Sequence, residues 1–306
     1  MERGFGPFLF RNKKLNVMKL TIAQRNQAVI KMALQGPSGS GKTYSSLLIA
    51  SGLCTDWTKV AIIDTEYHSA HLYSSLGTYN VLSLEEPFSP ERYIEAIESC
   101  ESAGMKVIII DSISHEWEGS GGILDIHGSM AGNSFANWAK LTPRHNAFVQ
   151  KILQSPCHII STIRSKQDYV LTDRNGKMVP EKVGLKGVTR DGMDYEFSLV
   201  LDLDIKHMAT ASKDRTGLFM DKYPIVPSGL TGERIWTWCM GDELMEHIHS
   251  QIAGANTIQE LRAIIIKYPT LRDRVEPLCI ARKIQIERDV TENVVEPIKT
   301  SDNGNN

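Results

Sequence analysis

The chain has 306 residues, a formal net charge of -2, and 42% hydrophobic and 23% charged residues. This length suits one large domain with a small appendage, or two domains, and the composition is that of a globular protein with a full core. The near-neutral charge excludes a histone-like basic protein, so any nucleic-acid site must be a local patch. The five cysteines are widely spaced, which argues against a disulfide framework or a zinc site and fits a reducing cytoplasm.

The first residues contain no recognisable targeting signal. Residues 8–10 are the only apolar cluster there, which is too short for the core of a signal peptide. Met18 is the more natural start, so residues 1–17 are interpreted as a disordered leader or a start-site artefact. No apolar run in the chain approaches the ~18 residues that a membrane helix needs.

From residue 28 onward, short apolar runs alternate with helical patterns. Strands are predicted at residues 28–36, 59–66, 105–112 and 157–163, and helices at residues 41–53, 89–104 and 137–155. Ser89 and Pro90 are a typical helix start, and Pro143 is expected to mark a kink or a boundary. Continuous apolar strands between helices predict a mostly parallel sheet with helices on both faces.

The pattern changes after residue 194. Three runs without intervening helices predict strands that lie antiparallel at the sheet edge, at residues 195–205, 216–223 and 234–240. From Gly241 the chain reads as helical, and its last residues are polar. The sequence therefore predicts an α/β fold with a core at 18–240, a small helical region at 241–290 and a polar tail at 291–306.

The segment "GPSGSGKT" matches the phosphate-loop pattern G-x-x-x-x-G-K-[ST]. Glycines let successive backbone N–H groups point at phosphate oxygens, and a lysine reaches the β- and γ-phosphates. A strand before the segment and an apolar helix after it favour a nucleotide site over an ordinary glycine turn. We assign ATP binding to this segment, namely Gly36, Pro37, Ser38, Gly39, Ser40, Gly41, Lys42, Thr43 and Tyr44.

Two further acidic positions complete the predicted site. Asp111 ends the apolar strand "VIIID" and, with the Thr43 hydroxyl, would hold Mg²⁺; the alternative is a helix cap after a buried strand. Asp64 and Glu66 end the second strand, where Glu66 would deprotonate the attacking water, a role that small-molecule P-loop kinases do not need. The alternative for this pair is two solvated loop carboxylates.

These motifs resemble those of RecA-type recombinase ATPases, over residues 28–223. The matching stretches are "GPSGSGKT", "DTEY" and "IIIDS". The resemblance implies a RecA-like P-loop NTPase core in which Glu66 is the catalytic base. The stretch "STIRSK" keeps Arg164 and Lys166 of the segment that opens the RecA DNA-binding loop, but Thr162 replaces the glutamine that senses the γ-phosphate.

The nearest resemblance is to phage RecA-like ATPases grouped with Sak-type single-strand annealing proteins. It rests on residues 184–203 and on "SKDRTGLF" at 212–219. It implies a homo-oligomer with ATP at subunit interfaces, in which Lys213 and Arg215 reach a neighbour's ATP as arginine fingers do. The alternative is a charged hairpin. Phage recombination proteins or single-strand-binding proteins are the implied partners, and the cytoplasm of a bacterial host is the implied location.

Residues 164–190 hold seven basic and three acidic residues, a positive balance in a chain of net charge -2. The segment is predicted to form a hairpin that turns at residues 175–176, and Tyr169 would stack on a base. We predict contacts to single-stranded DNA from Arg164, Lys166, Lys182, Lys186 and Arg190. The alternative is a solvated hairpin without such a role.

A second glycine-rich stretch, residues 116–138, is too irregular for a predicted element and has no Lys or Arg. Its Trp117, Phe135 and Trp138 are expected in the core or at subunit contacts. A metal other than Mg²⁺ is not expected, because "HEWEG" lacks the second histidine of a zinc motif and "HSAH" has no third ligand.

The leading hypothesis is a DNA-stimulated ATPase that acts in phage-type recombination or annealing. Two alternatives stay open at this point: a nucleotide-dependent loader or adaptor in replication, and a small-molecule P-loop kinase.

Overall fold

The computed structural model describes residues 28–174 and 177–294, with no side chains for residues 167–185, Asp242 and 289–294. The predicted leader, residues 175–176 of the predicted turn, and the Tyr169 and Lys182 side chains therefore lie outside the described part.

A single sheet with the strand order β3-β2-β4-β5-β1-β7-β8 forms the centre of the molecule. Its strands are β1 (Lys31–Gly36), β2 (Val60–Asp64), β3 (Asn80–Ser83), β4 (Val107–Asp111), β5 (His158–Arg174), β7 (Leu199–Leu203) and β8 (Ala209–Asp214). All neighbours pair in parallel except β7 and β8, which are antiparallel. The predicted mostly parallel sheet with an antiparallel edge is confirmed.

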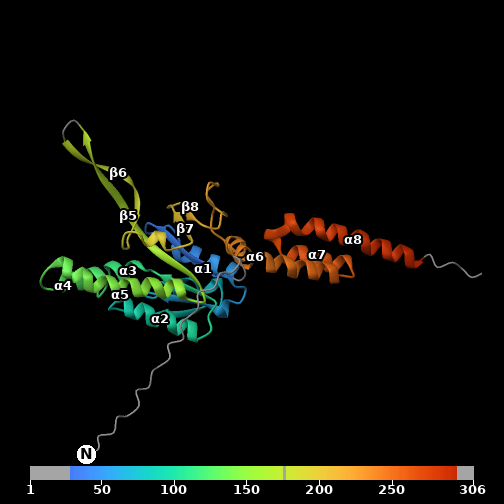
Figure 1. The fold of residues 1–306 in the computed structure, drawn as a ribbon, viewed down its shortest axis with the longest axis horizontal. Helices are drawn as coiled ribbons and strands as arrows, with labels where there is room; N and C mark the ends of the chain where they lie inside the picture. The colour runs from blue at the N-terminus through green and yellow to red at the C-terminus, as the bar shows by residue number, and fades with distance from the viewer. Residues whose placement is uncertain (1–27, 175–176, 295–306) are drawn as a thin grey trace, which may run out of the picture.

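Helices cover both faces of this sheet (Figure 1). The longer ones are α1 (Lys42–Leu53), α2 (Pro90–Ser102), α5 (Ser134–Gln154) and α6 (Gly229–Gly254). Helices α2 and α5 pack on one face, whereas α1 and the start of α6 pack on the other. Short 3-10 turns lie at Trp57–Lys59, Ser69–Leu76, Met193–Tyr195 and Pro269–Leu271.

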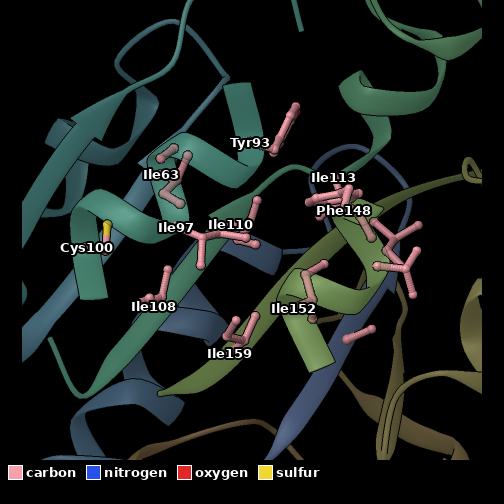
Figure 2. Close-up of a cluster of buried hydrophobic side chains, with 14 of the residues drawn as sticks. Ile63, Tyr93, Ile97, Cys100, Ile108, Ile110, Ile113, Phe148, Ile152 and Ile159 are labelled. Carbon is pink, nitrogen blue, oxygen red and sulfur yellow. The ribbon is translucent and has the colours of Figure 1, made fainter. Parts of the chain in front are cut away.

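The strand β4 explains why both faces need a cover. Its branched residues alternate, so that Ile108 and Ile110 face α2 and α5, while Val107 and Ile109 enter the opposite cluster. Figure 2 shows the first face, where these strand residues meet side chains of α2 and α5 such as Ile97 and Phe148. A strand that is apolar on both faces is stable only between two layers.

A long two-stranded arm leaves the sheet at β5 (Figure 1). β5 continues past the sheet and pairs antiparallel with β6 (Lys177–Gly187), with Lys166 opposite Lys186 and Arg174 opposite Lys177. The predicted hairpin is present, and its first strand is a continuous extension of β5.

Two predicted strands are wrong. Residues 216–223 form turns instead, because the Asp214 carboxylate accepts hydrogen bonds from Thr216, Phe219 and Met220 backbone N–H groups and winds the chain around itself. Residues 234–240 lie in α6, where Ile235 and Cys239, four residues apart, face the core. Their apolar run follows the helical period, not the alternation of a strand.

The prediction of an irregular loop at residues 116–138 is also wrong. These residues form the last part of α3 (Ser114–Glu118), the whole of α4 (Ile123–Ser129) and the start of α5. Trp117 and Trp138 are half-buried and stack with ring centroids 5.9 Å apart, but Phe135 is 84% exposed. Helix α5 begins where Asn133 accepts two backbone N–H groups, and it runs through Pro143 without the expected boundary.

The C-terminal helices form a third apolar cluster. Helix α6 is interrupted at Gly241, whose φ of 60° and ψ of -138° are not helical. Its second half packs with α7 (Ile258–Lys267) and α8 (Arg272–Val294) around residues such as Ile248 and Val275. Within the described residues, none of the helices has the length and apolar character needed to cross a membrane.

Candidate nucleotide-binding site

The glycine-rich segment connects β1 to α1 at the carboxyl edge of the sheet. Gly39 and Gly41 have φ values of 79° and 83°, which residues other than glycine rarely adopt. The Lys42 amine donates hydrogen bonds to the Gly36 and Pro37 carbonyl oxygens, both at 2.9 Å. Burial lowers the pKa of Lys42, while the Asp111 and Glu66 carboxylates act in the opposite direction. The loop is thus closed by its own lysine and has the shape of a phosphate cradle.

Space also restricts the first position of the loop, Gly36. A Cβ on Gly36 would lie 2.6 Å from the Leu203 carbonyl oxygen, so no larger residue fits there. The buried Ser40 hydroxyl has no hydrogen-bond partner among the described residues. Helix α1 begins immediately after Gly41, so its positive end faces the loop. These features fit an anionic phosphate chain.

Thr43, Asp111 and Thr162 form a connected group beside the loop. The Thr43 hydroxyl donates to one Asp111 oxygen at 2.6 Å, and the Thr162 hydroxyl donates to the other. Thr162 comes from β5, which lies between β1 and β4. The residue that replaces the expected glutamine therefore orients the Asp111 carboxylate.

Asp111 is only 2% exposed, and burial raises its pKa against the hydrogen bonds from Thr162 and Thr43. Among the described residues, it forms no ion pair with Lys or Arg, and no three His, Cys, Asp or Glu side chains cluster to hold a metal. A buried carboxylate either pairs with a cation or becomes neutral, which makes Asp111 a candidate cation ligand. One carboxylate and one hydroxyl suit Mg²⁺, which takes its other ligands from water and phosphate.

Asp64 ends β2 and Glu66 lies two residues beyond it, and the two carboxylates have different partners. The Asp64 carboxylate accepts backbone N–H groups of Glu66 at 2.7 Å and Ala70 at 2.9 Å. It therefore shapes the turn, while the Glu66 side chain points to the neighbouring strands. Asp64 is in register with Asp111 on β4, which places Glu66 next to the group formed by Thr43, Asp111 and Thr162.

The Glu66 carboxylate is held by Arg164 through two hydrogen bonds, one of them at 2.9 Å between Arg164 Nε and Glu66 Oε1. Ser112 donates a third at 3.3 Å. Burial acts to raise the pKa of Glu66, but Arg164 outweighs it and holds the pKa below its usual value. The guanidinium of Arg164, a predicted DNA contact, lies on the predicted catalytic base.

Sequence reasoning missed Thr65 and His115. The Thr65 hydroxyl accepts the Ser112 backbone N–H at 2.9 Å and lies 2.7 Å from His115 Nδ1. His115 is buried and stacks on Phe88. Burial lowers the pKa of His115, and the Arg164 charge adds to this effect. These contacts fix the ends of β2 and β4 relative to each other, and no sequence motif indicates them.

Aromatic rings flank the start of α1. Tyr44 is 43% exposed, and its ring centroid lies 5.7 Å from that of Tyr73, at 60°. Tyr44 lies in the first turn of the helix, directly after Thr43, and the Tyr73 ring is half-buried. An exposed tyrosine ring in this position suits the base of a nucleotide, since nucleobases stack on aromatic side chains.

Lys213 and Arg215 lie at the outer edge of the sheet, on and just after β8. The Lys213 amine donates to the Asp194 carbonyl oxygen at 2.9 Å and to that of Tyr195. Arg215 also donates to the Tyr195 carbonyl oxygen, at 3.4 Å. Both side chains are bound within the chain, on the far side of β7 from the phosphate loop.

The other predicted DNA contacts do not form one cluster. Lys166 and Lys186 lie opposite each other on the arm, and Lys186 pairs with Asp191 at 2.7 Å. Arg190 donates to the Thr142 hydroxyl on α5 at 3.3 Å. The arm therefore presents Lys166 and Lys186, whereas Arg164 and Arg190 turn toward the body.

A strand, a glycine-rich loop and a helix, with a lysine in the loop and a buried carboxylate on β4, define an α/β P-loop nucleotide-binding protein. A family model described as an AAA domain matches residues 28–225, about two thirds of the chain. The chain therefore belongs to this AAA domain family, which is of the P-loop ATPase type. A search of curated proteins finds no match to the chain.

Proposed function

We propose that this protein is an oligomeric ATPase that binds single-stranded DNA and hydrolyses ATP when DNA engages it, in phage-type recombination or annealing. One observation carries the proposal: Arg164 joins the candidate base Glu66 to the strand that becomes the basic arm. A phosphate that attracts Arg164 would free Glu66 to accept a proton from water. DNA binding and hydrolysis would then be linked through one side chain.

The residues have separate roles in this proposal. The loop N–H groups and Lys42 bind the phosphates, and Thr43 and Asp111 hold Mg²⁺, which neutralises charge on the phosphate oxygens when bound. Glu66 takes the proton of the attacking water. Lys213 and Arg215 would act on the ATP of a neighbouring subunit after leaving the carbonyl oxygens that they bind.

A loader or adaptor that binds ATP without turning it over is the second candidate. It is favoured by the same pair, because a carboxylate bound to Arg164 on both oxygens is a weak base. In this case nucleotide binding alone would change the shape of the carboxyl edge of the sheet.

Phosphate release from ATP, measured with and without single-stranded DNA, tests the proposal. We expect slow release by the protein alone, faster release with DNA, and none from Lys42→Ala, which keeps the fold but removes the amine that binds phosphate. Nucleotide binding by fluorescence titration without release in either condition would replace the ATPase with the adaptor. Normal release by Lys42→Ala would place hydrolysis outside this loop.

A further inference from the structure

The turn between β7 and β8 is held in one shape by hydrogen bonds to a single residue. Asp204 donates its backbone N–H to the Met208 carbonyl oxygen at 3.0 Å. Its side chain accepts the backbone N–H groups of Lys206 at 2.8 Å and Met208 at 2.9 Å. His207 donates its own N–H to the Asp204 carbonyl oxygen at 3.1 Å. The turn therefore presents the His207 side chain in a defined direction.

His207 itself has an uncommon backbone conformation. Its φ is 64°, in the left-handed region that few residues other than glycine enter, although Asn, Asp and His do so more often than the rest. A residue held in this region costs free energy, which other contacts must offset. The contact that the ring makes is with the phosphate loop.

The imidazole of His207 lies against Ser40 and Gly41. Its Nδ1 is 3.0 Å from the Ser40 carbonyl oxygen, and since a carbonyl only accepts, Nδ1 carries the proton. A Cβ added to Gly41 would lie 3.0 Å from the same nitrogen. The ring thus covers the Ser40–Gly41 peptide just before Lys42 and the start of α1.

The strand β7 continues this contact along the loop. The Leu203 carbonyl oxygen approaches the Cα of Gly36, and the Gln35 amide donates to Asp202 at 2.5 Å. One side of the loop, from Gly36 to Gly41, therefore rests on the end of β7 and its turn. The peptide that His207 fixes carries the N–H of Gly41, which must face a phosphate in a loop of this type.

We infer that His207 is a positioning residue for the nucleotide: its bond to the Ser40 carbonyl holds the next N–H groups in the direction of the phosphates. The inference rests on the proposed nucleotide binding at this loop. The strained conformation of His207 is maintained because the turn must bring the ring to Ser40.

Three substitutions separate backbone strain from the hydrogen bond. His207→Gly relieves the strain and removes the bond, and His207→Ala removes the bond but keeps the strain. His207→Asn tolerates the conformation and keeps an N–H donor. Lys206→Ala, which changes the neighbouring exposed side chain of the same turn, is the matched control.

The measurements are the Kd for Mg·ATP by calorimetric titration and the melting temperature without nucleotide. We expect Gly and Ala to raise Kd by about 5- to 10-fold, as for removal of one hydrogen bond. We expect Asn and the control to stay within about twofold. The Gly variant should melt at or above the wild-type temperature, so that affinity and stability move in opposite directions.

Wild-type affinity in the Gly variant overturns the inference, as does a Kd that follows the melting temperature across the series. A wild-type protein that binds no ATP overturns the proposed nucleotide binding and the inference with it. Wild-type binding with unaffected variants removes the His207 role alone, so the two failures are distinguishable.

Discussion

Glu66 and Arg164 come from strands that are not adjacent, since β4 lies between β2 and β5. Register brings them together: Arg164 is level with Gly36 of β1, and Asp64, two residues before Glu66, is level with Asp111. The pair lies between the phosphate loop, the group formed by Thr43, Asp111 and Thr162, and the start of the β5–β6 arm. A change in the hydrogen bonds of Glu66 and Arg164 should therefore affect all three.

Replacement of Arg164 by Ala should release the Glu66 carboxylate. We expect ATP hydrolysis without DNA to rise by about 3- to 10-fold, because a freed carboxylate is a better general base. Added single-stranded DNA should then increase the rate little further. The measurement is steady-state phosphate release with and without DNA.

Arg144→Ala is the matched control, because Arg144 makes the same two-bond contact with Glu91, at 2.7 and 2.8 Å, on the outside of α2 and α5. It should leave both rates unchanged. A fall in the basal rate of Arg164→Ala would mean that Arg164 holds Glu66 in a productive position.

The same variant should change the pH dependence of hydrolysis. In the wild type, Arg164 keeps the pKa of Glu66 below its usual value, so the base stays ionised as the pH falls. Without Arg164, burial raises that pKa, and the rate should decline at a higher pH on the acid side. Profiles of kcat/KM from roughly pH 4.5 to 8 measure the shift. Identical acid limbs would assign the base to another group.

At the scale of whole elements, α1 and α6 approach each other through glycines. A Cβ on Gly232 would lie 2.0 Å from the Ile49 carbonyl oxygen, and one on Gly52 would lie 1.9 Å from that of Gly229. Helix backbones in such contact leave no room for a methyl group. This contact anchors the helix that follows the family-matched region onto the helix that begins at the phosphate loop.

Gly232→Ala should lower the free energy of unfolding by about 1–3 kcal/mol, because the two helices must separate to admit the methyl group. Gly254→Ala in the same helix is the control, since nothing lies within 4 Å of its Cβ position. In the control, the higher helix propensity of Ala should leave stability equal or improved by up to about 1 kcal/mol. Urea unfolding measures both, and equal effects would disprove the close contact.

The elements that sequence predicted correctly are those whose pattern is local. The four apolar strands at residues 28–36, 59–66, 105–112 and 157–163 each follow from a continuous apolar run, and a buried parallel strand needs no partner-specific signal. The strand β3 was missed because its four residues are exposed or half-buried. The sequence predicts a strand at residues 234–240 because bulky side chains fill most positions, whereas the structure shows a helix that buries Ile235 and Cys239, four residues apart.

The site divides in the same way. The loop and Thr43 follow from the spacing of one motif and Asp111 from the end of an apolar strand, and Thr43 and Asp111 meet in the structure. The roles of Arg164, Thr162 and His207 depend on strand order and on a turn shape, which no spacing encodes. Sequence therefore indicates which groups can bind phosphate and metal, but not which groups hold them in place.

On the scale of the whole molecule, the arm of β5 and β6 projects beyond the body (Figure 1). Replacing both Lys166 and Lys186 with Ala should weaken binding to single-stranded DNA. It should also reduce the slope of log K against log salt by about 0.7 for each phosphate that the protein no longer binds. ATP binding should persist, since neither residue touches the loop. A binding titration across salt concentrations measures the effect.

The charge-matched control is the double variant Lys59→Ala and Lys106→Ala. These two residues are hydrogen-bonded to each other just before β2 and β4, at the amino end of the strands and away from the phosphate loop. It removes the same charge and should leave the slope unchanged. Equally weakened DNA binding in both double variants would mean that the arm contributes only its net charge, and that the DNA site lies elsewhere.

The β7–β8 hairpin has its turn on the phosphate loop, through His207, and its far end at Lys213 and Arg215. The distance along β8 is only six residues, roughly 20 Å of extended chain. If those basic side chains reach the ATP of a neighbouring subunit, one hairpin contacts two nucleotides, its own at the turn and the neighbour's at the far end. ATP hydrolysis in adjacent subunits would then be coupled in one direction along the oligomer. The degree of cooperativity would depend on how rigid β8 is.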